Sequence, residues 1–229
     1  MFLPTITVFF LNLVLFTFCL EKAAQKYQKK RSRASLYLVV LFFGCGFINL
    51  CSALDGLLYG PVFSFRLFYA ISLIATGISS VALVCFSMDV FFTKEEGELN
   101  SSMKIVRDLY SIAEMAICTW GALQLMIEQT SATTIPLILI FTTGISLYIA
   151  LASKSYNLAK RIDDVIYKKP ITYIGHFAVF NLFIFLFFIL DSMSVGNEGG
   201  TWWGFIGAFV FMLTAVLAYM GFLKPVKQE

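Results

Sequence analysis

The chain has 229 residues, 59% of them hydrophobic and 17% aromatic, and its mean hydropathy is +0.82. Soluble domains are roughly 45–50% apolar, so this composition excludes an ordinary soluble protein and indicates that a lipid bilayer is the solvent. The formal net charge is +3, and of the 17 Lys and Arg residues only Arg66 falls in a segment that we expect to face outward. By the positive-inside rule, this asymmetry predicts an outer N-terminus and a cytoplasmic C-terminus.

Seven apolar segments follow one another along the chain and predict an all-α bundle of seven transmembrane helices. We expect the spans at residues 3–20, 36–59, 65–92, 105–127, 135–153, 171–190 and 202–223. The connections are too short for a folded soluble domain, so residues 1–229 are expected to form a single membrane domain. The basic connections are interpreted as topology determinants beside anionic lipid, with no nucleic acid as partner. The expected location is the plasma membrane, with several passes through it.

Charged and turn residues mark the ends of these spans. The first span precedes the basic stretch EKAAQKYQKKRSRAS, which is the charge order of an N-out helix and not of a cleaved signal peptide. Gly60-Pro61 ends the second span, because proline favours a turn or extended conformation before it. The connection TKEEGELNSS is the only acidic one on the inner side, and Trp202-Trp203 opens the seventh span at headgroup level.

The fourth span carries one carboxylate, Glu114, near its centre. A charge in the middle of an apolar slab about 30 Å thick is costly unless it is protonated, paired or wetted, so Glu114 is a candidate site. Depth counting along the helices places Asn49, Ser79 and Asn181 near the same level. Two interpretations remain open: a proton- or ligand-linked site, and a protonated structural carboxyl that fixes helix packing.

Small and polar residues form stripes at helical spacing, which indicates faces that contact protein and not lipid. On the fourth span the stripe reads Arg107, Ser111, Glu114, Cys118, Gly121, Leu125 and Glu128. On the fifth it reads Thr143, Ser146, Ala150 and Ser153. Tight packing with modest interhelical hydrogen bonds accounts for most of these positions.

A second candidate group lies near the expected outer face. Its members are Asp55, Arg66, Tyr69, Asp191 and Trp202, with Glu128 as a further counter-charge for the single outer cation. They are interpreted either as an interfacial ion-pair cluster that ties helix ends together or as the rim of an outward-opening ligand pocket.

The cysteines and the histidine argue against several site classes. All five cysteines lie in apolar segments without a C-x-x-C pair, which argues against a disulfide framework or a thiolate metal site. The single histidine, His176, argues against a multi-histidine haem or di-metal centre. We expect no cofactor and no metal, and we do not expect an enzyme, because no nucleophile–base or metal set lies at membrane depth.

A weak internal repeat aligns the second span with the sixth at an offset of 136 residues. It matches Tyr37 with Tyr173 and Leu54-Asp55 with Leu190-Asp191, which suggests three helices, a linking fourth helix and three more. This arrangement is similar to that of sugar-transporting seven-helix proteins, but their proline-glutamine signature is absent. The seventh span also lacks the lysine that a retinal-binding rhodopsin needs.

The stretch Ala53–Phe92 resembles the second and third helices of the seven-helix sensor domains that precede prokaryotic histidine kinases. The resemblance rests on helix spacing, the Pro61–Arg66 connection and the apolar texture, and it covers under a fifth of the chain. It implies a sensor-like domain, and because no kinase follows the seventh span, the signal would pass to a separate partner.

The sequence predicts a receptor- or sensor-like protein that binds a small or lipidic ligand from the outer side, among spans two, three, six and seven. Its basic inner loops would signal to a membrane or cytoplasmic protein partner. The first alternative is a small proton-linked transporter that uses Glu114. The second is a membrane scaffold or assembly subunit. No motif in the sequence names the ligand.

Overall fold

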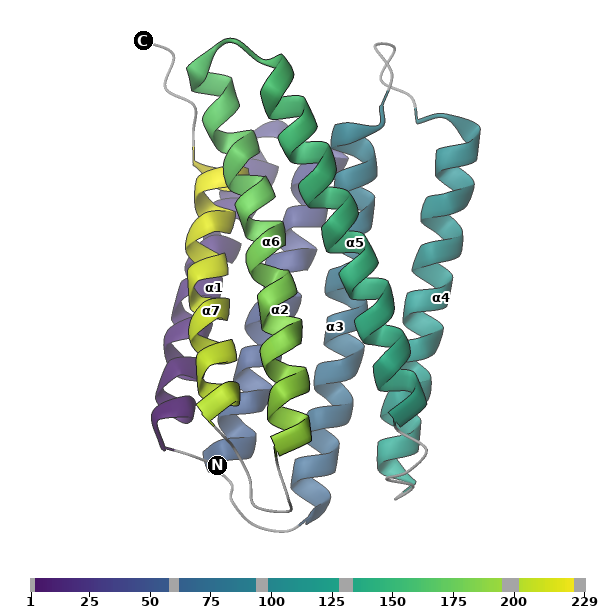
Figure 1. Cartoon of the computed structure of the whole chain (residues 1–229), viewed down its shortest axis with the longest axis vertical. Coiled ribbons are helices and arrows are strands. Elements are labelled where there is room, and N and C mark those ends of the chain that lie inside the picture. The colour runs from purple at the N-terminus through teal and green to yellow at the C-terminus, as the bar shows by residue number, and fades with distance from the viewer. Residues whose placement is uncertain (1–2, 58–61, 94–98, 128–133, 195–201, 225–229) are drawn as a thin grey trace.

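A computed structural model describes residues 3–57, 62–93, 99–127, 134–194 and 202–224. Within these residues the chain forms seven α-helices and a short π-helical turn, η1, which continues the last helix (Figure 1). The elements are α1 (Leu3–Lys30), α2 (Arg33–Leu57), α3 (Val62–Phe91), α4 (Ser101–Met126), α5 (Thr134–Arg161), α6 (Val165–Ser194), α7 (Trp202–Ala218) and η1 (Tyr219–Leu223). The all-α prediction is confirmed.

Six of these helices, all except α4, are long and apolar enough to cross a membrane. The chain is therefore a multi-pass, membrane-spanning helical protein. Helix α4 is less apolar because Lys104, Arg107, Asp108, Glu114 and Gln124 interrupt its hydrophobic residues. A seventh crossing by α4 and the predicted orientation stay predictions.

Several helices extend well beyond the predicted spans. The basic residues that follow the first span continue α1 to Lys30, and α5 continues to Arg161. Helix α6 begins already at Val165, so that only a short connection separates it from α5. The apolar periodicity marks the part of a helix that meets lipid or core, whereas the backbone hydrogen bonds continue into the polar turns beyond it.

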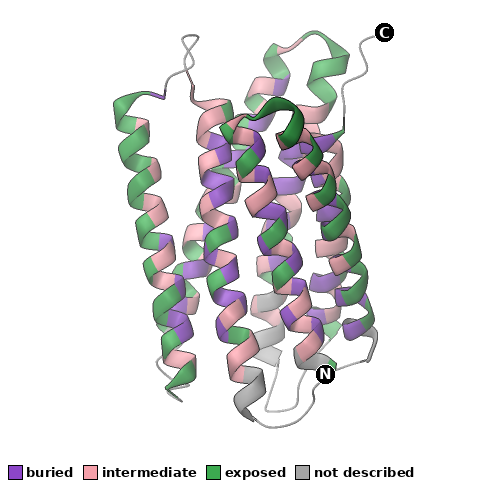
Figure 2. Cartoon of the chain, turned by 180° about the vertical axis from the view of Figure 1, so that it is seen from behind, coloured by how far each residue is buried: buried purple, intermediate pink, exposed green. Residues whose placement is uncertain are grey.

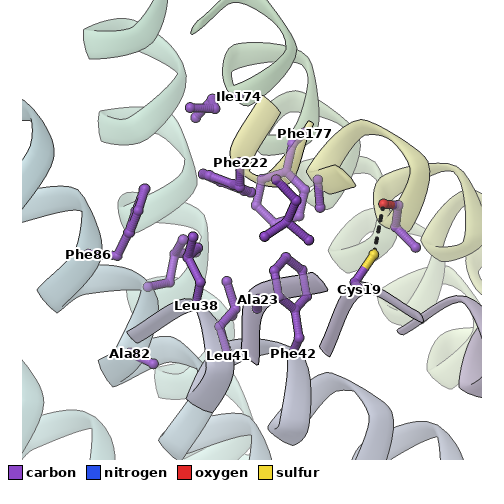
Figure 3. Close-up of a cluster of buried hydrophobic side chains, with 14 of the residues drawn as sticks. Cys19, Ala23, Leu38, Leu41, Phe42, Ala82, Phe86, Ile174, Phe177 and Phe222 are labelled. Atoms are coloured by element: carbon purple, nitrogen blue, oxygen red, sulfur yellow. Dashed lines mark hydrogen bonds between the residues drawn. The ribbon is translucent and has the colours of Figure 1, made fainter. Parts of the chain in front are cut away.

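The main hydrophobic core is built by α1, α2, α3, α5, α6, α7 and η1. Aromatic and aliphatic side chains from distant parts of the sequence meet there, including Phe42, Phe86, Phe177 and Phe222 (Figure 3). The rings of Phe86 and Phe177 each pack edge-on against Phe222, with centroids 5.1 and 5.3 Å away. Helix α4 contributes no residue to this core.

Helix α4 lies at the edge of the bundle, beside α3 and α5 (Figure 1). Most of its surface is exposed, and its buried residues are confined to Glu114, Cys118, Gly121 and Ala122 (Figure 2). Leu73 of α3, Cys118 of α4 and Ile140 of α5 form a small separate cluster at this edge. The helix is therefore attached to a six-helix body and is not part of its core.

The two sets of three helices that flank α4 in the sequence have equivalent neighbours. Helix α2 packs between α1 and α3, and α6 packs between α5 and α7. Contacts of α1 with α7 and of α3 with α5 close the ring. This arrangement is compatible with two parallel repeats joined by α4, although the duplication itself stays a prediction.

Glycines allow the closest helix contacts. A Cβ atom placed on Gly44 of α2 would overlap Ser79 Oγ of α3, and one on Gly77 of α3 would lie 3.0 Å from the Cβ of Cys118. A Cβ on Gly121 of α4 would lie 3.2 Å from the Cβ of Pro136. Small residues thus let α2 approach α3, and let α4 approach α3 and α5, as is usual between membrane helices.

Candidate functional site

Glu114 is the most completely buried carboxyl group among the described residues, with 1% of its surface exposed. It shares a helix face with Cys118 and Gly121, at spacings of four and three, and this face packs against α3 and α5. Thr143 of α5 donates a hydrogen bond from Oγ1 to Glu114 Oε2 over 2.6 Å. This bond joins the edge helix to the six-helix body.

The second oxygen of the carboxyl group is less well satisfied. Ser80 of α3 lies near enough to Glu114 to interact with it through its side chain. Oε1 nevertheless has no partner within hydrogen-bonding distance among the described residues. A buried carboxyl with one short hydrogen bond and one free oxygen can keep a proton or exchange it when its surroundings change.

Tyr110, one turn before Glu114 on α4, contacts the same threonine. Its hydroxyl donates to the main-chain oxygen of Thr143 over 3.4 Å. The side chain and the backbone of Thr143 therefore each hold one residue of α4. A movement of α4 away from α5 would break both contacts.

A groove of about 190 Å³ lies between α3, α4 and α5, and Tyr110 forms part of its wall. From α3 it is lined by residues such as Val84 and Phe91, from α4 by Val106, and from α5 by residues that include Leu147. Helices α4 and α5 approach each other closely at Gly121 and Pro136 and lie farther apart near Val106 (Figure 1). The groove occupies the space between the separated parts of the helices.

One charged side chain, Lys154, lines the groove among the described residues. Its Nζ lies over the Phe92 ring, 4.6 Å from the centroid. Lys154 belongs to the last two turns of α5, on the side of the bundle that we predict to be cytoplasmic. The groove thus runs from Tyr110, beside the Glu114–Thr143 contact, to a cation near the end of the helix.

The other predicted members of the central site bond to their own helices. Asn49 Nδ2 donates to Cys45 O over 2.7 Å, Ser79 Oγ to Ala75 O over 2.9 Å, and Asn181 Nδ2 to Phe177 O over 2.8 Å. All three side chains are buried. Within the described part of the chain, none of them is hydrogen-bonded to Glu114. The structure brings Glu114 together with Thr143, Ser80 and Tyr110, which the predicted set does not contain.

Thr143 was recognisable in the sequence as a member of the polar stripe on the fifth span. The predicted stripe marks the buried face of α4, but on α5 its members Ser146, Ala150 and Ser153 are exposed. A stripe also does not say which neighbouring helix supplies a partner.

Two buried asparagines, Asn49 of α2 and Asn12 of α1, each have an Oδ1 atom without a partner among the described residues. Asn12 Nδ2 donates to Ala208 O of α7 over 3.0 Å.

The predicted outer rim is described only in part. Arg66 and Tyr69 lie in the first turns of α3, and Trp202 begins α7 with 66% of its surface exposed. The side chains of Asp55 and Asp191 lie outside the described residues, and so does Glu128. The interpretation of this group as a pocket rim therefore stays a prediction.

Comparison with known proteins finds no family model, no curated protein and no solved structure that matches this chain. Among the described residues, no group of three or more His, Cys, Asp or Glu side chains could hold a metal ion. The arrangement described above offers a buried carboxyl group, a hydrogen bond between α4 and α5, and a largely apolar groove with one lysine among its described lining residues.

Proposed function

We propose that the chain is a receptor- or sensor-like membrane protein in which a small or lipidic ligand changes the position of α4 relative to the six-helix body. The observation that carries this proposal is the attachment of α4. This helix lies outside the main core and packs along α3, but its contact with α5 is sparse and includes the Thr143–Glu114 hydrogen bond. Elements with few buried contacts open at the lowest free-energy cost.

Ligand binding can be coupled to this movement through Tyr110. The residue lines the groove and also contacts Thr143, the residue that holds Glu114. A ligand that separates α4 from α5 in the groove therefore acts directly on the contact that fixes α4. Such a ligand shifts the equilibrium only by its difference in affinity for the two positions of α4.

The signal would leave the protein at the basic ends of the helices. The start of α4 carries Lys104 and Arg107, and the end of α5 carries Lys160 and Arg161. A displacement of α4 would change the distance between these two groups of cations, which a separate acidic partner can detect. The partner itself is inferred from this charge pattern.

The experiment is a distance measurement by double electron–electron resonance. Spin labels are placed at Lys104→Cys on α4 and Lys160→Cys on α5, two exposed positions, in a variant whose five native cysteines are replaced. The control pair is Lys29→Cys on α1 and Lys160→Cys, which reports on two helices of the six-helix body.

We expect the distance distribution of the α4 pair to change between delipidated protein in detergent and protein reconstituted in a total lipid extract, while the control pair stays the same. Glu114→Gln should shift the balance between the distances of the α4 pair. An α4 distance that is single and identical under all conditions would contradict the proposal.

A second candidate is a small proton-linked transporter, which the free Oε1 atom of the buried Glu114 favours. A transporter moves substrate in liposomes and loses proton coupling in Glu114→Gln, whereas a receptor moves nothing. Flux with a proton gradient therefore separates these two functions.

The scaffold or assembly function is favoured by a different feature, the exposed apolar outer face of α4. Leu109, Ile112 and Leu123 are each more than half exposed on this helix. If this face serves only assembly, Glu114→Gln should change stability and neither distances nor flux.

A further inference from the structure

We infer that the groove between α3, α4 and α5 binds an anionic membrane lipid, with an acyl chain along the groove and the headgroup at Lys154. This inference rests on the proposed function, for which it names the ligand class and the place of binding.

The lining of the groove is suited to an apolar part of a ligand. Three hydroxyl groups reach the groove, from Ser87, Tyr110 and Ser146, but each of them donates to a main-chain oxygen. The acceptors are Leu83 O at 2.7 Å, Thr143 O at 3.4 Å and Thr142 O at 2.8 Å, respectively. With these donors used, the remaining wall offers hydrocarbon, and an apolar space of this kind does not hold water well.

The groove is long enough for an acyl chain. Its α5 wall runs from Ser146 to Lys154, which is about 12 Å of helix. Half of a bilayer's hydrocarbon core is about 15 Å thick. A chain that enters beside Lys154 would therefore reach Tyr110 and Ser146 within the depth of one leaflet.

The groove is accessible from the lipid side. Val106 of α4 and both Ser146 and Ala150 of α5 line it and are exposed. A lipid can thus enter laterally between α4 and α5 without opening the six-helix body. An occupant in this position would touch Tyr110, which links the site to the Glu114–Thr143 contact.

The cation selects the headgroup. Lys154 is exposed, and no carboxylate lines the groove among the described residues. Its Nζ contacts the Phe92 ring, which leaves its hydrogen-bond donors available for a phosphate oxygen. A basic residue near the membrane surface favours an anionic lipid by about 1 kcal/mol, which corresponds to about a fivefold preference.

Native mass spectrometry of the protein in mild detergent tests this inference. Dioleoylphosphatidylglycerol and dioleoylphosphatidylcholine are titrated separately, because they share acyl chains and differ in headgroup charge. The variants are Lys154→Gln, which removes the cation, and Ala150→Trp, which fills the groove. Their matched controls on the same helix are Lys160→Gln and Ile149→Trp, two exposed positions that do not line the groove.

We expect the wild-type protein to bind the anionic lipid about fivefold more tightly than the zwitterionic one. Lys154→Gln should abolish this preference while binding of the zwitterionic lipid stays the same. Ala150→Trp should weaken both lipids, and both controls should resemble the wild type. Ala150→Leu is a milder filling variant, and circular dichroism checks that each variant is folded.

Three results would overturn the inference: equal binding of both lipids by the wild type, the same loss of preference in Lys160→Gln as in Lys154→Gln, or unchanged binding in the filling variants. The distance measurement separates this failure from failure of the proposed function. Lipid binding without movement of α4 would retain the site and refute the sensor. Movement of α4 that persists in Lys154→Gln and Ala150→Leu, in variants that have lost the lipid, would retain the sensor and refute the groove as the place where its ligand binds.

Discussion

The Thr143 hydroxyl on α5 lies 2.6 Å from Glu114 Oε2 on α4 and connects the edge helix to the rest of the bundle. The carboxyl is 1% exposed, and its other oxygen has no hydrogen-bond partner among the described residues. Thr143 is therefore the only described residue that makes a hydrogen bond of normal length to the Glu114 carboxyl.

Replacing Thr143 by valine keeps the shape of the side chain and removes the donor. We expect Thr143→Val to lower the free energy of unfolding by about 1–2 kcal/mol, because the buried carboxyl is left without a hydrogen bond. Unfolding by sodium dodecyl sulfate, followed by circular dichroism, measures this change. The control is Thr142→Val, an exposed neighbour whose hydroxyl bonds, among the described residues, to Ile138 O of its own helix. Equal effects of the two substitutions on the free energy of unfolding would show that the hydrogen bond to Glu114 does not stabilise the protein.

Substitutions at Gly44 of α2 and Ser79 of α3 test whether Ser79 serves to pack these two helices together. Gly44→Ala should destabilise the protein by about 1–3 kcal/mol, because the new Cβ would overlap Ser79 Oγ and lie 3.2 Å from Ala75 O. Ser79→Ala in the same protein should restore part of the stability by removing that oxygen. Gly46→Ala is the control, since the nearest atom to its Cβ would be 3.9 Å away. Independent, additive effects in the double variant would contradict this interpretation.

Lys26 of α1 binds a main-chain carbonyl group at the C-terminal end of the last helix. Its Nζ donates to Phe222 O of η1 over 2.7 Å, and the side chain is half-buried. Carbonyl groups in the last turn of a helix lack partners within that helix. Lys26→Met should cost about 1–2 kcal/mol in thermal or detergent unfolding, whereas Lys29→Met, at an exposed position on the same helix, should be nearly neutral. A loss shared equally by both variants would indicate a general charge effect.

Tyr156 of α5 and His176 of α6 form a hydrogen bond between the Tyr156 hydroxyl and His176 Nδ1, 2.7 Å apart. Tyr156→Phe should lower the free energy of unfolding by about 1 kcal/mol, since it leaves the partly buried histidine nitrogen unpaired. In a His176→Phe background the same substitution should have little further effect. Tyr167→Phe, at an exposed position on α6, serves as control. A full additional loss in the double variant would show that the two residues act independently.

The hydrophobic pattern was sufficient to predict the all-helical fold, because lipid-exposed backbone must satisfy its hydrogen bonds within each helix. It predicted seven membrane spans, and six of the helices are long and apolar enough to cross a membrane. The burial of Glu114 was also predictable, since a lone carboxylate on a stripe of small residues has to face protein. The same pattern overstated how apolar α4 is. Apolar residues surround Glu114 on both sides, yet the polar residues of α4 leave it outside the six membrane-length helices.

The sequence by itself determined the solvent of this protein, the number of helices and the buried face of α4, whereas most of the stripe predicted on the fifth span is exposed. Only the tertiary structure decided that α4 lies outside the main core, that Glu114 meets Thr143 and not Asn49, Ser79 or Asn181, and that a groove ends at Lys154. The physical reason is that periodicity is a property of one helix, set by its own 3.6-residue repeat. The choice of neighbour depends instead on crossing and close approach between helices far apart in the sequence, at positions such as Gly121 and Pro136.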